Sequence, residues 1–154
     1  MRIGFTGTQK GMTEHQFDVF VNVIHTLMRQ DGDGSVFHHG DCVGCDQQAH
    51  QIVAALRGDC NYDIKFDIHP PSDPKSRAFC KGKDTDTVRH PAPYLVRNHS
   101  IVDEVDFLIG CPKGAKEVLR SGTWATVRYA RESSKKIMLI FPDGSQVLTK
   151  GDGS

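Results

Sequence analysis

Short apolar runs alternate along the chain with segments whose apolar residues recur at helical spacing. Five of the runs have the length of β-strands, and they cover residues 2–6, 35–39, 64–69, 106–111 and 136–141. The first intervening helix is expected to start at a capping box, Thr13-Glu14-His15-Gln16. Strands that alternate with helices form a parallel sheet. We therefore predict an α/β fold, a single-domain Rossmann-like parallel sheet of about five strands with helices on both faces.

The length of the chain fits one domain. With 154 residues it can bury a core without disulfides or metals. We expect residues 1–150 to form that domain and residues 151–154 to be a disordered tail. A polar stretch, residues 72–90, has almost no apolar periodicity and is interpreted as a long insert. It is either a solvated loop or a lid that closes on a ligand phosphate through Arg77, Lys81 or Arg89.

Composition and charge restrict the class of function. Lys and Arg total 19, as do Asp and Glu, so the net charge gives no reason to expect attraction to nucleic acid or to anionic membranes. No apolar run approaches the roughly 18 residues that a membrane span needs. Five cysteines in a chain that opens with a strand-like segment, rather than a secretory signal, indicate reduced thiols. We expect a cytoplasmic protein with no membrane partner.

Glycines and polar side chains follow three of the predicted strands. Ligands of open parallel sheets bind outside the carboxyl ends of the strands, where helix N-termini present free N–H groups. Each loop alone could be only a tight turn or a helix cap, but three loops on one edge favour a ligand site. The candidate ligand-binding residues are Thr6, Gly7, Thr8, Gly40, Asp41, Gly44, Asp46, Arg120, Ser121, Gly122 and Thr123.

A pair of cysteines, Cys42 and Cys45, follows His38 and His39. A structural zinc site usually has a second paired set of ligands, which the other cysteines do not supply. A thioredoxin-like role fits no better, because the flanking glycine and aspartates suit a ligand loop. We therefore predict neither a metal site nor a cofactor. His69, after the third strand, is interpreted as a structural histidine.

With these motifs the chain resembles the SLOG superfamily, named for Smf/DprA-like and LOG-like proteins. The resemblance extends over residues 4–8, 39–44, 94–98, 101–106 and 120–130. It implies a Rossmann-like fold with a nucleotide phosphate on the turn formed by Ser121, Gly122 and Thr123. It also implies a homodimer.

The resemblance gives Arg97 a possible role. With Asn98 it could clamp a phosphate and a base, since a guanidinium pairs bidentately with phosphate. The alternative is a surface salt bridge from Arg97 to Asp103 or Glu104.

The LOG enzymes of this superfamily hydrolyse the N-glycosidic bond of nucleoside monophosphates with a glutamate and an upstream arginine. Arg97 stands where such an arginine could lie, but Thr126 occupies the place of the glutamate. A hydroxyl is a poor replacement for a carboxylate that stabilises an oxocarbenium centre or activates water. If the protein is an enzyme, a carboxylate from another loop must act. The catalytic candidates are then Arg97, Asp41, Asp46 and Glu104.

Three functions are compatible with this pattern. The first is a sensor or sponge that captures a small nucleotide or a nucleotide-derived signal, such as an ADP-ribose or a cyclic nucleotide. The second is a nucleoside monophosphate N-glycosidase. The third, binding of single-stranded DNA through the basic insert, predicts an affinity that falls steeply with salt. The neutral net charge makes this third function the weakest of the three.

Overall fold

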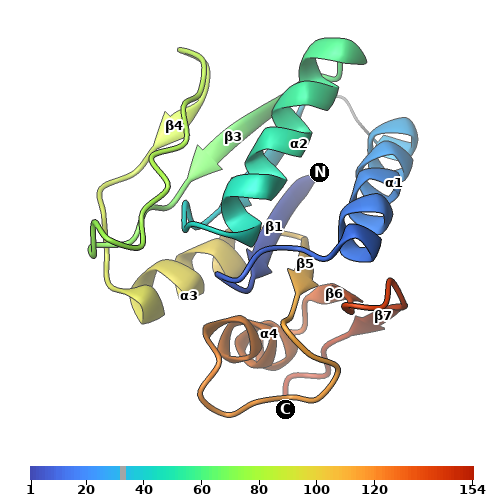
Figure 1. Cartoon of the computed structure of the whole chain (residues 1–154), viewed down its shortest axis with the longest axis vertical. Helices are drawn as coiled ribbons and strands as arrows, with labels where there is room; N and C mark the ends of the chain where they lie inside the picture. The colour runs from blue at the N-terminus through green and yellow to red at the C-terminus, as the bar shows by residue number, and fades with distance from the viewer. Residues whose placement is uncertain (32–33) are drawn as a thin grey trace.

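The computed structural model of the protein describes residues 1–31 and 34–154. In these residues the elements follow in the order β1 (Arg2–Gly7), α1 (Glu14–Asp31), β2 (Ser35–His39), α2 (Cys45–Asp59), β3 (Ile64–Ile68), β4 (Thr87–Val88), α3 (Tyr94–Glu104), β5 (Phe107–Cys111), α4 (Gly122–Glu132), β6 (Lys136–Ile140) and β7 (Gln146–Lys150) (Figure 1).

The strands join one sheet with the order β4-β3-β2-β1-β5-β6-β7. Neighbouring strands from β4 to β6 are parallel, whereas β7 pairs antiparallel with β6. From β1 the chain first builds the half that ends at β4, and it then crosses to β5 and builds the other half. The strand order therefore reverses between β1 and β5. A reversal of this kind opens a crevice at the carboxyl ends of the strands.

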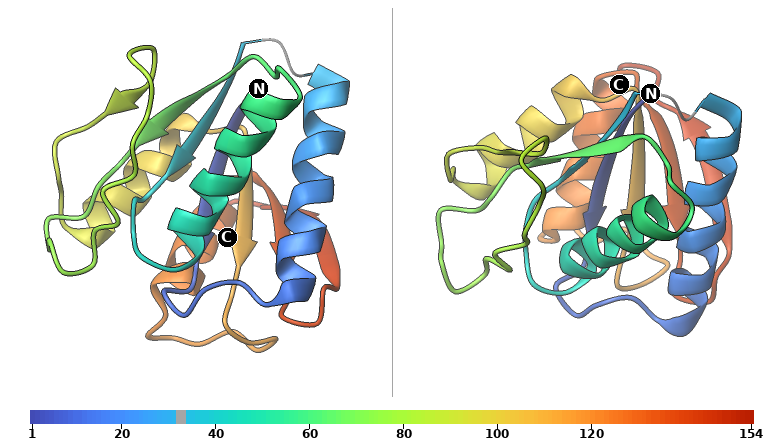
Figure 2. Two further views of the ribbon diagram at one scale, coloured as in Figure 1. Left: turned by 45° about the horizontal axis from the view of Figure 1, so that its top comes forward. Right: turned by 90° about the horizontal axis from the view of Figure 1, so that it is seen from above.

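Helices cover both faces of the sheet (Figure 2). The helices α1 and α2 pack on one face, over a core that contains Phe5, Phe20, Phe37 and Phe66. The helices α3 and α4 pack on the other face, in a smaller core that contains Trp124. Burial of large aromatic side chains supplies much of the stability of such cores. None of the helices in the described residues is long and apolar enough to cross a membrane.

The predicted α/β fold is confirmed, with more strands than expected. The predicted strand over 35–39 coincides with β2, and each of the other four differs from the observed strand by one residue. The capping box is present, because Thr13 N–H donates to Gln16 Oε1 (3.0 Å) and Gln16 N–H donates to Thr13 Oγ1 (3.1 Å). The sheet has seven strands rather than about five. The two unexpected strands lack an apolar run, since β4 has two residues and β7 is exposed along its length.

Backbone hydrogen bonds tie residues 72–90 to the loop after β2 and to β3. Ala78 N–H donates to Asp41 O (2.7 Å), and Arg89 N–H donates to Ile68 O (2.9 Å). Within this insert, β4 adds to the sheet beside β3. The insert is therefore held against the carboxyl ends of these strands.

Residues 151–154, which the sequence predicts as a disordered tail, also form backbone hydrogen bonds. Gly151 N–H donates to Lys135 O (2.8 Å), and Gly153 N–H donates to Arg131 O (3.1 Å). These bonds join residues 151–154 to the last turn of α4 and to the residue before β6.

Candidate functional site

A cavity of about 270 Å³ opens at the carboxyl edge of the sheet, beside the reversal of strand order. Its walls come from the end of β1, the loop after β2, the first turns of α3 and the start of α4. The predicted residues that line it are Thr6, Gly7, Thr8, Gly40, Asp46, Arg97, Asn98, Ser121, Gly122 and Thr123. The residues that line it without having been predicted are Phe5, Gln9, Cys42, Tyr94 and Ile101.

Two glycines allow the close contacts on which the cavity depends. A Cβ atom on Gly40 would lie 1.8 Å from Arg97 Nη1, and a Cβ atom on Gly7 would lie 2.4 Å from Cys45 Cβ. Real side chains do not approach so closely. Gly40 is therefore required for Arg97 to occupy its position, and Gly7 is required for β1 to pack against the start of α2.

Arg97 is the main charged group of the cavity, and only 5% of it is exposed. Its Nη1 donates to Gly40 O, and its two terminal nitrogens lie 3.6 and 3.5 Å from Cys42 Sγ. Asp46 Oδ2 is 3.9 Å from Nη1. In the described part of the chain, the buried Nε atom has no hydrogen-bond partner. Because an incompletely paired buried cation is unfavourable, Arg97 is suited to receive an anion.

Asp46, in the first turn of α2, is the carboxylate of the cavity. Its side chain is 7% exposed, and it accepts a hydrogen bond from Cys42 N–H (3.2 Å). Burial raises the pKa of Asp46 to about 6, although the nearby Arg97 opposes this shift. A carboxyl group with a pKa near neutrality in a cavity is suited to transfer a proton.

The first turn of α4 presents backbone N–H groups to the cavity. Ser121 caps the helix, because its side chain accepts from Trp124 N–H (3.2 Å) and its carbonyl accepts from Ala125 N–H (2.9 Å). The N–H groups of Gly122 and Thr123 lie in the first turn of α4, where backbone N–H groups have no intrahelical acceptor. Free N–H groups at a helix N-terminus attract anions. This wall of the cavity therefore has donors of the kind that a phosphate accepts from.

Tyr94 adds an aromatic surface that the sequence analysis missed. Its hydroxyl accepts from Gln9 Nε2 (3.2 Å), and the Arg97 guanidinium carbon lies 5.2 Å from the centre of its ring. The residue is 41% exposed, so part of the ring is accessible. Tyr94 precedes Arg97 by three residues in α3, and positions three apart on a helix share one face, so the spacing alone was a signal for its proximity.

Asp41, a predicted ligand-binding and catalytic candidate, holds the insert instead of lining the cavity. Its carboxylate accepts from Cys80 N–H (2.9 Å) and from Arg77 Nε (3.2 Å), and its side chain is 1% exposed. Its φ of 54° is unusual for a residue other than glycine. The role of Asp41 in this structure is to position residues 72–90.

Three further predicted residues lie outside the cavity. Gly44, with φ of 92°, packs against the backbone of Gln9, where a Cβ atom would lie 2.3 Å from the carbonyl oxygen. Glu104 pairs with Arg89, with 2.7 Å between Oε2 and Nη2. Arg120 is exposed and lines a neighbouring cavity of about 560 Å³ with Lys113, among others.

Two expectations about single residues can also be compared with the structure. Arg97 points into the fold toward Gly40, so the alternative of a surface salt bridge to Asp103 or Glu104 is wrong. Thr126, which stands in place of the LOG glutamate, is 1% exposed, and its hydroxyl donates to Gly122 O (2.8 Å). It offers no group to the cavity.

Two basic side chains of the insert already have carboxylate partners. Arg77 contacts Asp41, whereas Arg89 donates to Asp67 (2.8 Å) and to Glu104 (2.8 Å). Closure of a lid through Arg77 or Arg89 would require these ion pairs to break. For the same reason these two residues contribute little free positive charge for a nucleic acid.

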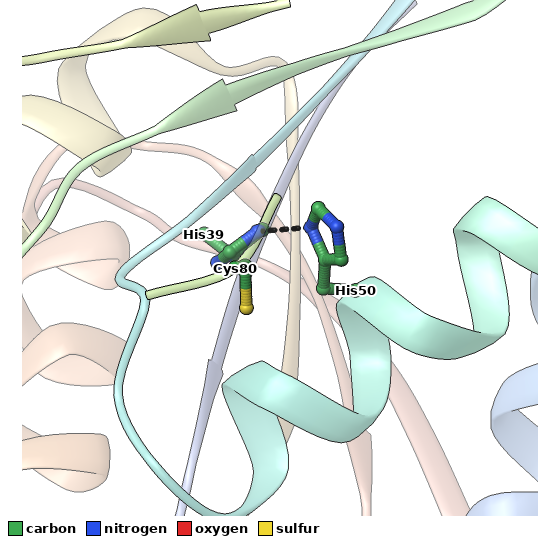
Figure 3. Close-up of side chains that lie close together, drawn as sticks. All are labelled: His39, His50 and Cys80. Carbon is green, nitrogen blue, oxygen red and sulfur yellow. Dashed lines mark hydrogen bonds between the residues drawn. The ribbon is translucent and has the colours of Figure 1, made fainter. Parts of the chain in front are cut away.

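Figure 3 shows a cluster of buried His39 at the end of β2, buried His50 on α2 and half-buried Cys80 in the insert. Asp41 N–H donates to His39 Nδ1 (3.0 Å), so the ring proton of His39 is on Nε2, which donates to His50 Nδ1 (2.9 Å). His50 Nε2 then donates to Lys81 O (2.9 Å). Burial lowers the pKa of both rings, which keeps them neutral. Each nitrogen has a partner in this chain of hydrogen bonds, which braces the insert against α2.

All five cysteines are free thiols in the described residues. Burial raises the pKa of Cys45, and the same effect raises the pKa of Cys42. Both groups are therefore neutral at physiological pH and poorly suited to act as nucleophiles. Cys42 lines the cavity against Arg97, whereas Cys45 packs against Gly7 outside the lining.

Comparisons with known proteins establish the fold and leave the family open. No known family model matches the sequence, and no curated protein matches it. Among solved structures, the crystal structure of TM1055, a structural genomics target, is similar with a TM-score of 0.56 and 13% sequence identity. The similarity covers 88% of this chain and 71% of that chain. The chain thus has an α/β, Rossmann-like fold that is also found in TM1055.

Proposed function

We propose that the protein binds a nucleotide or a nucleotide-derived signal in the cavity at the carboxyl edge of the sheet, as a sensor or a sponge. The observation that carries this proposal is that Arg97 and the start of α4 line the same cavity. Arg97, whose buried Nε has no hydrogen-bond partner among the described residues, lines the same small space as Gly122 and Thr123, whose N–H groups lie in the first turn of α4. Phosphate oxygens accept hydrogen bonds from both kinds of group, the guanidinium and the backbone N–H.

The size of the cavity favours a ligand of about one nucleotide. Its volume of about 270 Å³ lies just below the roughly 300–1,000 Å³ that is typical of small-molecule sites. The exposed part of Tyr94 provides a surface on which a base can stack. A ligand with further phosphates could extend past Thr8 and Ser121 into the neighbouring cavity, where Lys113, Lys116 and Arg120 lie.

The second candidate function is hydrolysis of an N-glycosidic bond, with Asp46 as the carboxylate. Asp46 lines the cavity, its pKa is raised to about 6 by burial, and it lies 3.9 Å from Arg97. A group of this kind can accept or donate a proton during the cleavage of a nucleotide held by Arg97. Asp46 is therefore the carboxylate we favour among Asp41, Asp46 and Glu104, because the other two lie outside the cavity.

We also propose that the protein forms a homodimer, as the resemblance implies. Leu95 is 64% exposed and Val96 is 57% exposed on α3, and contact between two copies would bury these side chains. Light scattering during size-exclusion chromatography measures the mass of the assembly, and a monomer at all concentrations would contradict the dimer.

The experiment that separates capture from turnover uses a panel of nucleoside mono- and diphosphates, ADP-ribose and cyclic nucleotides. Purified protein is incubated with each compound, then denatured, and everything in solution is analysed by chromatography. Capture predicts one intact compound retained in proportion to protein. Free base and sugar phosphate would instead support hydrolysis, and they should disappear in Asp46→Asn. Arg29→Ala, at an exposed position near the end of α1 and away from both cavities, serves as the control for both outcomes. A panel without binding or turnover would contradict both functions.

A further inference from the structure

A second cluster of histidines and carboxylates lies on the opposite face of β2 and β3 from His39. His38 and Asp67 are register partners on these strands, and His69 follows Asp67 by two residues, so the three side chains share one face of the sheet. Glu104 reaches the same place from the end of α3, which covers this face. The cluster is separate from the cavity described above.

The four side chains bring their ligand atoms close together. His38 Nδ1 is 2.9 Å from His69 Nε2 and 3.8 Å from Asp67 Oδ2. His69 Nε2 is 3.5 Å from Asp67 Oδ1 and 3.9 Å from Glu104 Oε2, and one ligand atom from each residue lies within 4.8 Å of the others. Nitrogen and oxygen ligands at about 2.0–2.2 Å from a tetrahedral ion lie about 3.3–3.6 Å apart. Small side-chain rotations would therefore bring the cluster to that geometry.

The hydrogen bonds of this cluster are incomplete, unlike those of His39 and His50. His38 Nδ1 and His69 Nε2 face each other, and only one of these two nitrogens can carry the proton of their hydrogen bond. The other nitrogen is the acceptor. Arg89 Nη2 donates to Glu104 Oε1 (2.8 Å) and lies 2.7 Å from Oε2, so the contact of Oε2 among the described residues is this ion pair, without a hydrogen bond of its own. Two carboxylates share the single guanidinium of Arg89. With neutral rings the cluster thus retains one net negative charge.

We propose that His38, Asp67, His69 and Glu104 bind one divalent transition-metal ion of the Zn²⁺ class, with Arg89 as the competing cation. Imidazole and carboxylate are ligands that such ions favour. Access is available from the side of Glu104, whose side chain is 40% exposed, whereas the histidines are 3–4% exposed. The site therefore has two buried nitrogen ligands, from His38 and His69, and an accessible carboxylate, from Glu104.

The bound ion would join β2 and β3 to α3. Glu104 lies seven residues after Arg97 on α3, which corresponds to roughly 10 Å along a helix. An ion at Glu104 would fix the helix that carries Arg97 while remaining outside the cavity itself. This site is independent of the identity of the ligand in the cavity, and it remains testable if no nucleotide binds.

The test is a titration of the whole purified protein, first treated with a chelator, with Co²⁺ followed by its visible absorption. Site occupancy predicts one equivalent of Co²⁺ with visible bands of low-symmetry coordination and without the near-ultraviolet band of a cobalt–thiolate bond. His69→Gln removes a ligand and should weaken binding at least about tenfold. Arg89→Gln removes the competing charge and should strengthen binding by about tenfold. His90→Gln, next to Arg89 but outside the cluster, should leave binding unchanged.

The opposite effects of two substitutions distinguish a metal site from a structural cluster. A merely destabilised protein would lose binding in both variants, and Arg89→Gln remains informative if His69→Gln does not fold. Absence of stoichiometric Co²⁺ in both the wild type and Arg89→Gln would overturn the proposal. A thiolate band that disappears in Cys80→Ser would also overturn it, because the ion would then be bound by the cluster of His39, His50 and Cys80.

Discussion

Asp41 and Asp46 both follow β2, at positions 41 and 46, and both are buried. The structure nevertheless gives the two carboxylates different surroundings. The Asp41 carboxylate has two partners from the insert, Arg77 Nε and Cys80 N–H. Asp46 lines the cavity, with Arg97 at 3.9 Å. A buried polar group with a full set of partners holds structure together, whereas one that faces a cavity remains available for a ligand. Partners, rather than position in the sequence, separate the two roles.

The largest effect that separates the two carboxylates is expected for stability. Asp41→Ala leaves Arg77 and Cys80 N–H without their partner, and it should lower the free energy of unfolding by about 3 kcal/mol. Asp18→Ala, at an exposed position of α1, should change it by less than about 0.5 kcal/mol. Urea unfolding measures both values. Equal losses in the two variants would remove the structural role assigned to Asp41.

At the cavity, Gly40→Ala should displace the Arg97 guanidinium from its position. The added methyl group would lie 1.8 Å from Nη1, so the guanidinium must move out of place. We expect nucleotide affinity to fall by about a hundredfold, through loss of a charged hydrogen-bond donor. Gly58→Ala in α2, where a Cβ atom meets no atom within 4 Å, is the matched control and should retain affinity. Unchanged affinity of Gly40→Ala in calorimetric titrations would exclude Arg97 as the phosphate ligand.

The pH dependence of stability tests the surroundings of Asp46. The pKa of Asp46 is raised from 3.8 to about 6 in the folded protein, so this group binds a proton more tightly when folded. Its contribution to stability is complete below pH 3.8 and is lost as the pH rises through about 6. Asp46→Asn lacks this titration, so its stability relative to the wild type should increase between these pH values. A constant difference across the window in pH-dependent urea unfolding would contradict the raised pKa.

The smallest expected effect concerns the aromatic wall. Tyr94→Ala removes the surface on which we place the base, and it should weaken nucleotide binding by about tenfold. Tyr94→Phe keeps the ring and loses only the contact with Gln9, so it should bind nearly as well as the wild type. Fluorescence or calorimetric titration distinguishes the two variants. A similar loss in both would assign the role to the hydroxyl instead of the ring.

The fold was predictable because its strands are apolar and its helices are amphipathic. The buried run of β5, Phe107–Cys111, and the capping box at Thr13 are local signals that survive in the structure. β4 and β7 were not predictable in this way, since exposed edge strands carry no apolar run.

The candidate site was predictable in part. Loops at one sheet edge converge by topology, so Thr6, Gly40 and Ser121 could be placed together before the structure. The role of Asp41 could not, because its partners come from an insert nearly forty residues away. Long-range contacts of this kind leave no periodic pattern in the sequence. The same limit applies to the cluster of His38, His69 and Glu104.

The most direct test of phosphate binding in the cavity is a pair of calorimetric titrations. One uses a nucleoside 5′-monophosphate, and the other uses the corresponding nucleoside without phosphate. Arg97 and the start of α4 are positioned for phosphate, so one base in the series should bind at one equivalent as the monophosphate and at least about a hundredfold more weakly as the nucleoside. Equal affinity for the two forms, or no binding of any monophosphate in the series, would contradict a phosphate site in this cavity.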